Sequence, residues 1–249
     1  MKVAKIRIEA PVVSFRYPHF LIGRQITFDM PPPSTIYGHI ASAVGDWIDP
    51  RPLRFAYHFS FKAKESDLEH QHIISRGKSD FKLDGKKYPT STTGVVQPHY
   101  RDFLYDCSLI LYLHPPELAE AFRNPCFCVN FGRSQDLARI VSVEELELEE
   151  AKGAYLENTL LPFSMRKYTG KGVTVLMPRY ITPPPEREPS FGRYVVLHDR
   201  LFAGEVDTPL QKLLQYEGDQ WWIDPSTPLL EGVHEGIVFH SFVGGEENV

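Results

Sequence analysis

The chain has 249 residues, of which 42% are hydrophobic, and a formal net charge of -5. That length allows one large or two small domains, and no apolar run reaches the roughly 18 residues that a transmembrane helix needs. The first residues, MKVAKIRIEA, alternate charged and apolar side chains and lack the apolar block of a signal peptide, so we expect a cytoplasmic protein with no membrane contact.

The predicted elements begin with a strand over 3–10, where apolar and charged residues alternate. A polar and aromatic loop follows, and a helix is predicted within PPPSTIYGHIASAVGDW, residues 31–47. We expect Ser34 to cap this helix, and Tyr37 and His39 to lie off its buried stripe, near its N-terminus. The apolar residues at helical spacing, which predict that stripe, are Ile36, Ile40, Val44 and Trp47.

Residues 53–63 alternate again and predict a second strand, which leads into a long polar excursion over 64–102. The segment FKLDGKKYP predicts a tight hairpin turn at Asp84–Gly85. Because such an excursion is too long for a plain connection, we interpret it as a protruding β-hairpin. An apolar strand over 104–113, a short helix over 115–124 and a further strand complete the series.

This order of elements predicts an α+β fold of the ferredoxin-like type, which RNA-recognition domains share. We expect residues 1–150 to form that domain, with the insert at about 64–102 protruding from it. Residues 151–249 contain short strands such as RYVVLH and predict a smaller β-rich region.

Charge is distributed unevenly along the chain. Residues 51–105 carry ten Lys and Arg against six Asp and Glu, whereas residues 205–249 carry one Lys against nine acids. This asymmetry favours a local anion site beside acidic surfaces, although a mixed solvated surface gives the same totals. We expect the acidic 205–249 segment to face protein partners or solvent.

Motifs for catalysis or metal binding are absent from the sequence. It contains no nucleophile elbow, phosphate-binding loop, dinucleotide fingerprint or HExxH motif. The histidines at 70–72 and 234–240 lack a complete set of ligands, and we interpret the three cysteines as buried strand residues, so we expect no metal and no cofactor. General acid–base cleavage of RNA needs only one or two groups near a 2′-hydroxyl, which keeps Tyr37 and His39 as candidates.

Several features are typical of proteins that bind single-stranded RNA. A helix N-terminus is a ready anion site, and Gly132-Arg133-Ser134 predicts a turn rich in phosphate donors. The hairpin interleaves basic residues with Phe81, Tyr88 and Tyr100, so cations hold phosphates while rings stack on bases. A simple helix cap and an ordinary exposed hairpin remain the alternatives. The candidate RNA-binding residues are Arg16, Arg24, Ser34, Tyr37, His39, Arg76, Lys78, Lys82, Lys86, Lys87, Arg101, Arg133 and Ser134.

Three segments occur in a familiar order: FRYPHFLIGRQITFDMPPPSTIYGHIASAVGD, RDFLYDCSLILYL and NFGRSQDL. Together they resemble the fifth Cas family of CRISPR-associated proteins, which are RAMP proteins of type I Cascade complexes. The resemblance covers most of residues 1–150, and the length and C-terminal region are most similar to the I-B-like branch.

The resemblance implies a ferredoxin-like palm with a hairpin thumb and a non-catalytic, RNA-binding role. In that role the protein binds the 5′ handle of the CRISPR RNA, caps the filament of backbone subunits and contacts the large subunit near the place where target DNA is read. By position, the resemblance assigns the handle site to Arg16, Arg24, Ser34, Tyr37, His39, Arg101, Arg133 and Ser134.

Two alternatives stay open. One branch, in subtype I-C, processes precursor CRISPR RNA and resembles a design with a tyrosine late in the first helix and a Lys-His pair after the thumb. Here that helix position falls near Val44 and no Lys-His pair occurs, so we expect no enzymatic activity. The alternatives are a metal-independent endoribonuclease that uses Tyr37 or His39, and a protein-interaction module whose hairpin binds a groove of another subunit.

Overall fold

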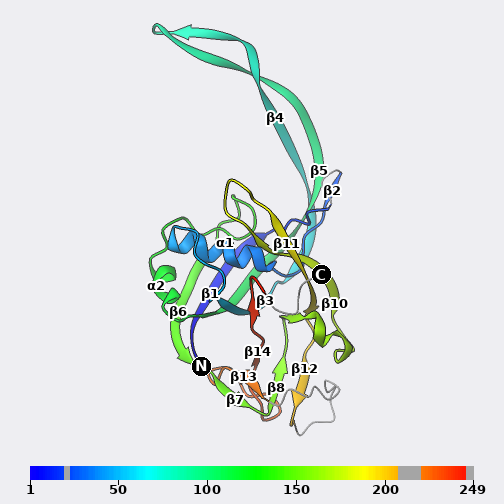
Figure 1. The fold of residues 1–249 in the computed structure, drawn as a ribbon. Coiled ribbons are helices and arrows are strands. Elements are labelled where there is room, and N and C mark those ends of the chain that lie inside the picture. The colour runs from blue at the N-terminus through cyan, green and yellow to red at the C-terminus, as the bar shows by residue number, and fades with distance from the viewer. Residues whose placement is uncertain (20–22, 207–219, 245–249) are drawn as a thin grey trace.

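The computed structural model describes residues 1–19, 23–206 and 220–244, so part of the acidic 205–249 segment lies outside the described residues. The protein is mostly β, with a large antiparallel sheet, two short α-helices and a long two-stranded ribbon that leaves the body (Figure 1). Within the described residues, no helix has the length and apolar character needed to cross a membrane.

The main sheet combines strands from both halves of the chain in the order β10-β11-β9-β3-β5-β1-β6. These strands pair antiparallel, and Ile6 at the centre of β1 lies between Leu111 of β5 and Val143 of β6. The strand bounds are β1 (Lys2–Val13), β3 (Arg54–Ser60), β5 (Lys86–His114), β6 (Arg139–Glu147), β9 (Thr159–Pro162), β10 (Val173–Ile181) and β11 (Pro189–Leu197).

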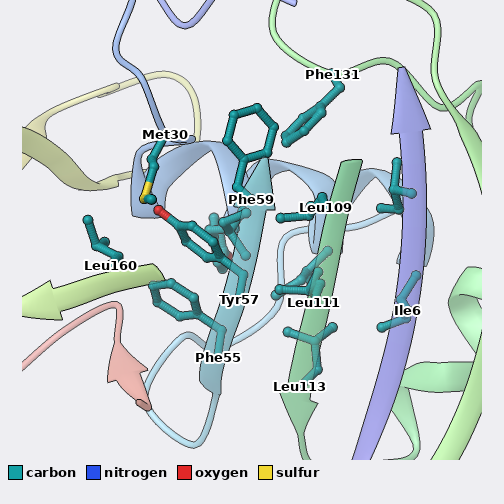
Figure 2. Packing of buried hydrophobic residues seen from close by; sticks show 14 of the residues in the cluster. Ile6, Met30, Phe55, Tyr57, Phe59, Leu109, Leu111, Leu113, Phe131 and Leu160 are labelled. Carbon is teal, nitrogen blue, oxygen red and sulfur yellow. The ribbon is translucent and has the colours of Figure 1, made fainter. Parts of the chain in front are cut away.

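Helix α1 (Pro33–Val44) lies across one face of this sheet (Figure 2). The sheet supplies the buried side chains of β1, β3 and β5, and the hydroxyl of Tyr57 donates to the carbonyl oxygen of Pro31 at 2.7 Å, which holds the proline run against β3. Figure 2 labels the core residues Ile6, Met30, Phe55, Tyr57, Phe59, Leu109, Leu111, Leu113, Phe131 and Leu160.

The start of α1 differs from the expected one. Pro32 occupies the N-cap position and no side chain caps the helix, so the prediction that Ser34 is the cap is wrong. Proline at the first helical position has the φ that a helix needs and no N–H to satisfy. The helix ends at Gly45, where φ is 88° and the amide donates to Ala41, so Trp47 lies beyond it and is 42% exposed rather than part of a buried stripe.

The predicted hairpin is confirmed. Strand β4 (Ala63–Leu83) pairs antiparallel with β5, and the turn lies at Asp84 and Gly85, where φ is 47° and 76°. Two consecutive positive φ values suit an Asp-Gly turn, because glycine adopts them without strain. We call the paired residues 63–105 the ribbon; its strand β5 continues from the ribbon tip into the centre of the main sheet (Figure 1).

Helix α2 (Leu118–Arg123) is shorter than the predicted 115–124, because Pro115 and Pro116 precede its hydrogen-bonded turns. The cysteine prediction holds for Cys107, which is buried in β5, and is wrong for the other two. Cys126 and Cys128 are exposed, since the segment after α2 runs as a loop over the surface rather than as a strand.

The described residues from 151 onward are β-rich, as expected. Their strands β9, β10 and β11 extend the main sheet, and β9 pairs with β3 through His58 and Thr159. The division at residue 150 stays a prediction. The remaining elements are β2 (Arg24–Gln25), β7 (Glu149–Ala151), β8 (Gly153–Leu156), β12 (Leu201–Gly204), β13 (Trp221–Ile223), β14 (Gly236–Ile237), β15 (His240–Ser241) and a 3-10 helix (Phe163–Lys167).

Candidate nucleic-acid interface

Several of the predicted arginines meet where the ribbon joins the body. Strand β2 runs parallel to β5, with Arg24 beside Tyr100 and Gln25 beside Arg101. Arg133 reaches the same place from the loop before β6, because it binds Glu69 of β4. We call this region, formed by Arg24, Arg101, Arg133 and their partners, the ribbon base.

Arg101 and Arg133 are not free cations. Arg101 Nε donates to Glu69 Oε2, and Arg133 Nη1 lies 3.5 Å from Glu69 Oε1. Burial raises the pKa of Glu69, but the two guanidinium groups outweigh it and leave that pKa below its ordinary value. Arg133 also binds Asp136 through Nε and Nη2, each at 2.8 Å, and the Asp136 side chain is only 3% exposed. Carboxylates therefore already orient both arginines.

The Gly-Arg-Ser turn is present as predicted, and buried contacts on its inner side fix its position. Phe131 is buried and packs edge-on against Phe15 and His39, with ring centroids 4.9 Å apart in both pairs. Gly132 has φ of 106°, and a Cβ there would lie 2.8 Å from the Ser14 carbonyl oxygen, so only glycine fits the close approach. Buried Phe131 and closely packed Gly132 thus fix the backbone that carries Arg133 at the surface.

Arg24 is the most accessible arginine of the ribbon base. Its side chain is 65% exposed, and Nε and Nη2 lie 3.2 and 3.1 Å from Asp102 Oδ1. Asp102 is buried and also accepts from the Ser66 hydroxyl at 3.0 Å. Arg16 is exposed on the neighbouring loop, in an isolated bridge with Thr27, so its charge lies on the segment that leads to β2.

Sequence reasoning missed one residue of the ribbon base, His99. It pairs with Glu69 across the ribbon and is only 4% exposed, and neither ring nitrogen has a hydrogen-bond partner in the described structure. Alternation along β5 places His99 on the same face as Arg101. That alternation is the signal that could have found it, whereas Tyr100 points to the other face and is 58% exposed.

The outer ribbon is exposed along its length. Near the tip the rings of Phe81 and Tyr88 stack across the strands, with centroids 5.5 Å apart and planes at 27°. Arg76 is paired with Asp80 at 3.2 Å. Within the described residues no ion pair involves the remaining basic candidates of the ribbon, which are Lys78, Lys82, Lys86 and Lys87.

The start of α1 does not form a polar opening. Tyr37 and His39 are 1% and 7% exposed, so the prediction that they lie off the buried stripe is wrong. The Tyr37 hydroxyl donates to the carbonyl oxygen of Ile48 at 2.6 Å, and its ring packs against Phe242, a residue far along the chain. Burial raises the pKa of Tyr37 above its ordinary value and lowers the pKa of His39 to about 4.

The other candidates lie at the surface or are partly covered. Ser134 is exposed in the turn, while Ser34 is half-buried at the second position of α1. His70 and His72 lie on the ribbon with ring centroids 6.5 Å apart. In the part of the chain that the structure describes, no group of three or more His, Cys, Asp or Glu side chains is placed to hold a metal ion.

Comparison with known proteins identifies the family of this chain. Residues 4–169 match the family described as CRISPR-associated protein (Cas_Cas5). The chain belongs to the Cas5 family. The match includes β1, α1, β3, the whole ribbon and the Gly-Arg-Ser turn, so every candidate residue of this Cas5 protein lies inside it. No curated protein sequence matches the chain.

One solved structure shares the fold of this Cas5 protein, and others show a weaker similarity. A chain of a CRISPR RNA-guided surveillance complex is 13% identical, with a TM-score of 0.52; the similarity covers 80% of this chain and 89% of that one. A chain of a type III-B Cmr-beta complex bound to cognate target RNA and AMPPnP is 10% identical, with a TM-score of 0.46 and coverage of 79% and 84%. A CRISPR protein from Archaeoglobus fulgidus is 8% identical, with a TM-score of 0.44 and coverage of 80% and 87%.

Proposed function

We propose that this protein is a non-catalytic RNA-binding subunit of a type I CRISPR surveillance complex, and that it holds the 5′ handle of the CRISPR RNA at the ribbon base. In this role its ferredoxin-like palm caps the filament of backbone subunits and contacts the large subunit near the place where target DNA is read. Membership of the Cas5 family and the shared fold support the assignment.

One observation carries the RNA site: arginines from three separate segments converge at the ribbon base. Arg101 and Arg133 present guanidinium groups on one face of the ribbon base, and Arg24 lies beside the exposed ring of Tyr100. Guanidinium groups bind phosphate in a forked geometry, and an exposed ring offers a stacking surface for an unpaired base. The lysines of the outer ribbon extend the positive surface away from this point.

The bound carboxylates fit this role. Glu69 and Asp136 hold the guanidinium groups of Arg101 and Arg133 in fixed positions before RNA arrives, which lowers the entropy lost on binding. They also reduce the net positive charge, so the site discriminates against weak contacts with arbitrary polyanions.

We also propose that the protein does not cleave RNA. A proton-transfer group must reach the reacting atom, and the candidates Tyr37 and His39 are enclosed by the core. The Tyr37 hydroxyl is engaged with a backbone carbonyl, and a His39 with a pKa of about 4 is neutral near pH 7, so it lacks the acidic imidazolium form that a general acid needs.

A gel shift in EDTA with labelled precursor CRISPR RNA from the protein's own locus tests the proposal. A scrambled RNA is the control. Selective binding with intact RNA is expected. A discrete cut at the handle boundary would establish the endoribonuclease instead. Equal affinity for both RNAs in the presence of the backbone subunit contradicts handle recognition, and no affinity for either leaves the protein-interaction module as the function.

A further inference from the structure

Strand β6 forms one edge of the main sheet, and in the described part of the chain β1 is the only strand that pairs with it (Figure 1). Among the described residues, no backbone hydrogen bond joins its outer edge to another segment. An edge strand presents alternate N–H and C=O groups to solvent, which a further strand is able to pair with. This edge lies outside the ribbon base.

Two cavities flank the beginning of β6. One, of about 530 Å³, lies between the ends of β1 and β5 and the residues that lead into β6, and Tyr105 and Leu137 line it. The other, of about 490 Å³, lies between β6 and the α2 region, and Phe122 and Val141 line it. Both cavities share Ala138 and Arg139, and the second continues along β6 to Val143.

The cavity between β6 and the α2 region gives a paired strand a place for its side chains. Successive side chains of a strand point to opposite faces, so a segment added beside β6 directs every second side chain toward the face that carries this cavity. Leu137 and Val141 are 60% and 42% exposed and offer apolar contact at the beginning of β6. This pattern is that of peptide recognition by strand addition, in which backbone bonds give affinity and flanking pockets give specificity.

The charge along the same edge restricts what binds. The sequence from 143 to 150 reads VEELELEE, and its glutamates are exposed. Arg123 pairs with Glu145 at 3.1 Å, whereas no ion pair involves Glu144, Glu147 or Glu149 in the described structure. Acidic side chains repel RNA and also repel a second copy of β6, because two such edges would bring like charges together.

We propose that the outer edge of β6 binds an extended, lysine- or arginine-bearing segment of a partner protein by strand addition. The apolar side chains of that segment enter the cavity between β6 and the α2 region, and its basic side chains lie beside Glu144 and Glu147. This surface is separate from the proposed RNA site, so neither proposal depends on the other.

The test uses the full chain and two fluorescein-labelled peptides of about eight residues, one alternating Val with Lys and the other alternating Val with Glu. Fluorescence anisotropy is expected to show saturable binding of the lysine peptide and none of the glutamate peptide. The double variant Glu144→Gln, Glu147→Gln is expected to weaken lysine-peptide binding about fivefold at low salt. The matched control Glu186→Gln, Glu188→Gln changes two exposed glutamates between β10 and β11 and is expected to leave it unchanged.

Hydrogen exchange with the same peptide locates the contact. Protection is expected in 139–147, where the outer amides of the free strand are open to solvent. Protection elsewhere, equal binding of both peptides, or no lysine-peptide binding up to about 1 mM overturns the proposal. A gel shift of the double variant with handle RNA is expected to match wild type, which separates this proposal from the RNA-binding one.

Discussion

Arg101 of the ribbon and Arg133 of the Gly-Arg-Ser turn bind the same carboxylate, that of Glu69. The pairing joins two segments that lie far apart in the chain, and it places a negative charge at the centre of the proposed RNA site. That charge orients the arginines and competes with phosphate for them at the same time.

Glu69→Gln is therefore expected to raise the affinity for handle RNA about two- to fivefold, the worth of one partly exposed ion pair. Filter binding or a gel shift at fixed salt measures the change. Glu65→Gln is the matched control, because Glu65 lies on the same face of β4 and is exposed. Weaker binding by Glu69→Gln would mean that orienting the arginines outweighs competition.

Arg133→Ala is expected to weaken handle binding by about 1–3 kcal/mol, the range for a charge-assisted contact. It also leaves the buried carboxylate of Asp136 without its ion partner, so the free energy of unfolding falls as well. Arg133→Lys keeps the positive charge but loses the forked geometry of the guanidinium group. Compared with Arg133→Ala, it is expected to restore the free energy of unfolding more fully than the affinity for handle RNA. Arg123→Ala, which changes an exposed arginine of α2, is the control. Unchanged affinity in Arg133→Ala would remove the turn from the site.

Lys86→Ala with Lys87→Ala tests whether the ribbon tip touches phosphate. Each lost phosphate contact makes the negative slope of log K against log salt shallower by about 0.7 for a single strand, so the double variant is expected to make it shallower by about 1.4. Measurement of affinity across a salt series gives the slope. Lys152→Ala with Lys171→Ala changes two lysines of the C-terminal half and is expected to leave the slope alone. An unchanged slope in the tip variant places the tip away from the RNA.

Tyr37→Phe separates a structural tyrosine from a catalytic one. Loss of the hydrogen bond to Ile48 is expected to lower the free energy of unfolding by about 1 kcal/mol, with handle RNA bound as before and uncut. Denaturant unfolding and the EDTA cleavage assay measure the two effects. A wild-type cut that disappears in Tyr37→Phe would contradict the non-catalytic role.

Asp224 links the C-terminal half to the sheet and predicts a pH dependence. Burial raises its pKa, but hydrogen bonds from Lys5, Ser226 and Tyr112 outweigh this, so the folded pKa lies below the ordinary value of 3.8. A depressed carboxyl pKa stabilises the fold above about pH 4, and that contribution is lost as pH falls through the folded pKa. Asp224→Asn is expected to reduce the free energy of unfolding at neutral pH by about 3 kcal/mol. It is also expected to make that free energy depend less on pH in the acid range.

Thermal melts of wild type and Asp224→Asn from neutral pH into acid measure this. The difference between the two proteins is expected to shrink as the pH falls below about 4. Parallel curves over the whole range would mean that Asp224 is not ionised in the folded state.

The order of elements and the hairpin were predictable because their signals are local. Period-two alternation and the Asp84–Gly85 turn depend on neighbouring residues alone. The burial of Tyr37 was not predictable in this way, because Tyr180 and Phe242 cover it from more than a hundred positions away. The four apolar residues at helical spacing indicated one buried stripe, whereas α1 is covered on more than one side.

The composition of the site was predictable and its electrostatics were not. Basic residues interleaved with rings indicated the ribbon, and the Gly-Arg-Ser segment indicated a turn. Which arginines are neutralised depends on pairing across the fold: Glu69 and Arg133 are 64 positions apart. His99 gave no signal on its own, because a single histidine among polar residues has no pattern until its strand face is known.

The place of β9 in the main sheet sets the order in which a nascent chain completes its fold. Thr159 donates to the carbonyl oxygen of Tyr57 across 102 positions of sequence. At about 5–20 residues per second, the ribosome therefore synthesises this part of β3 roughly 5–20 seconds before β9. During this interval the ribbon, whose contacts are local, is already able to form, so the growing chain completes its protruding ribbon before β9 joins the sheet.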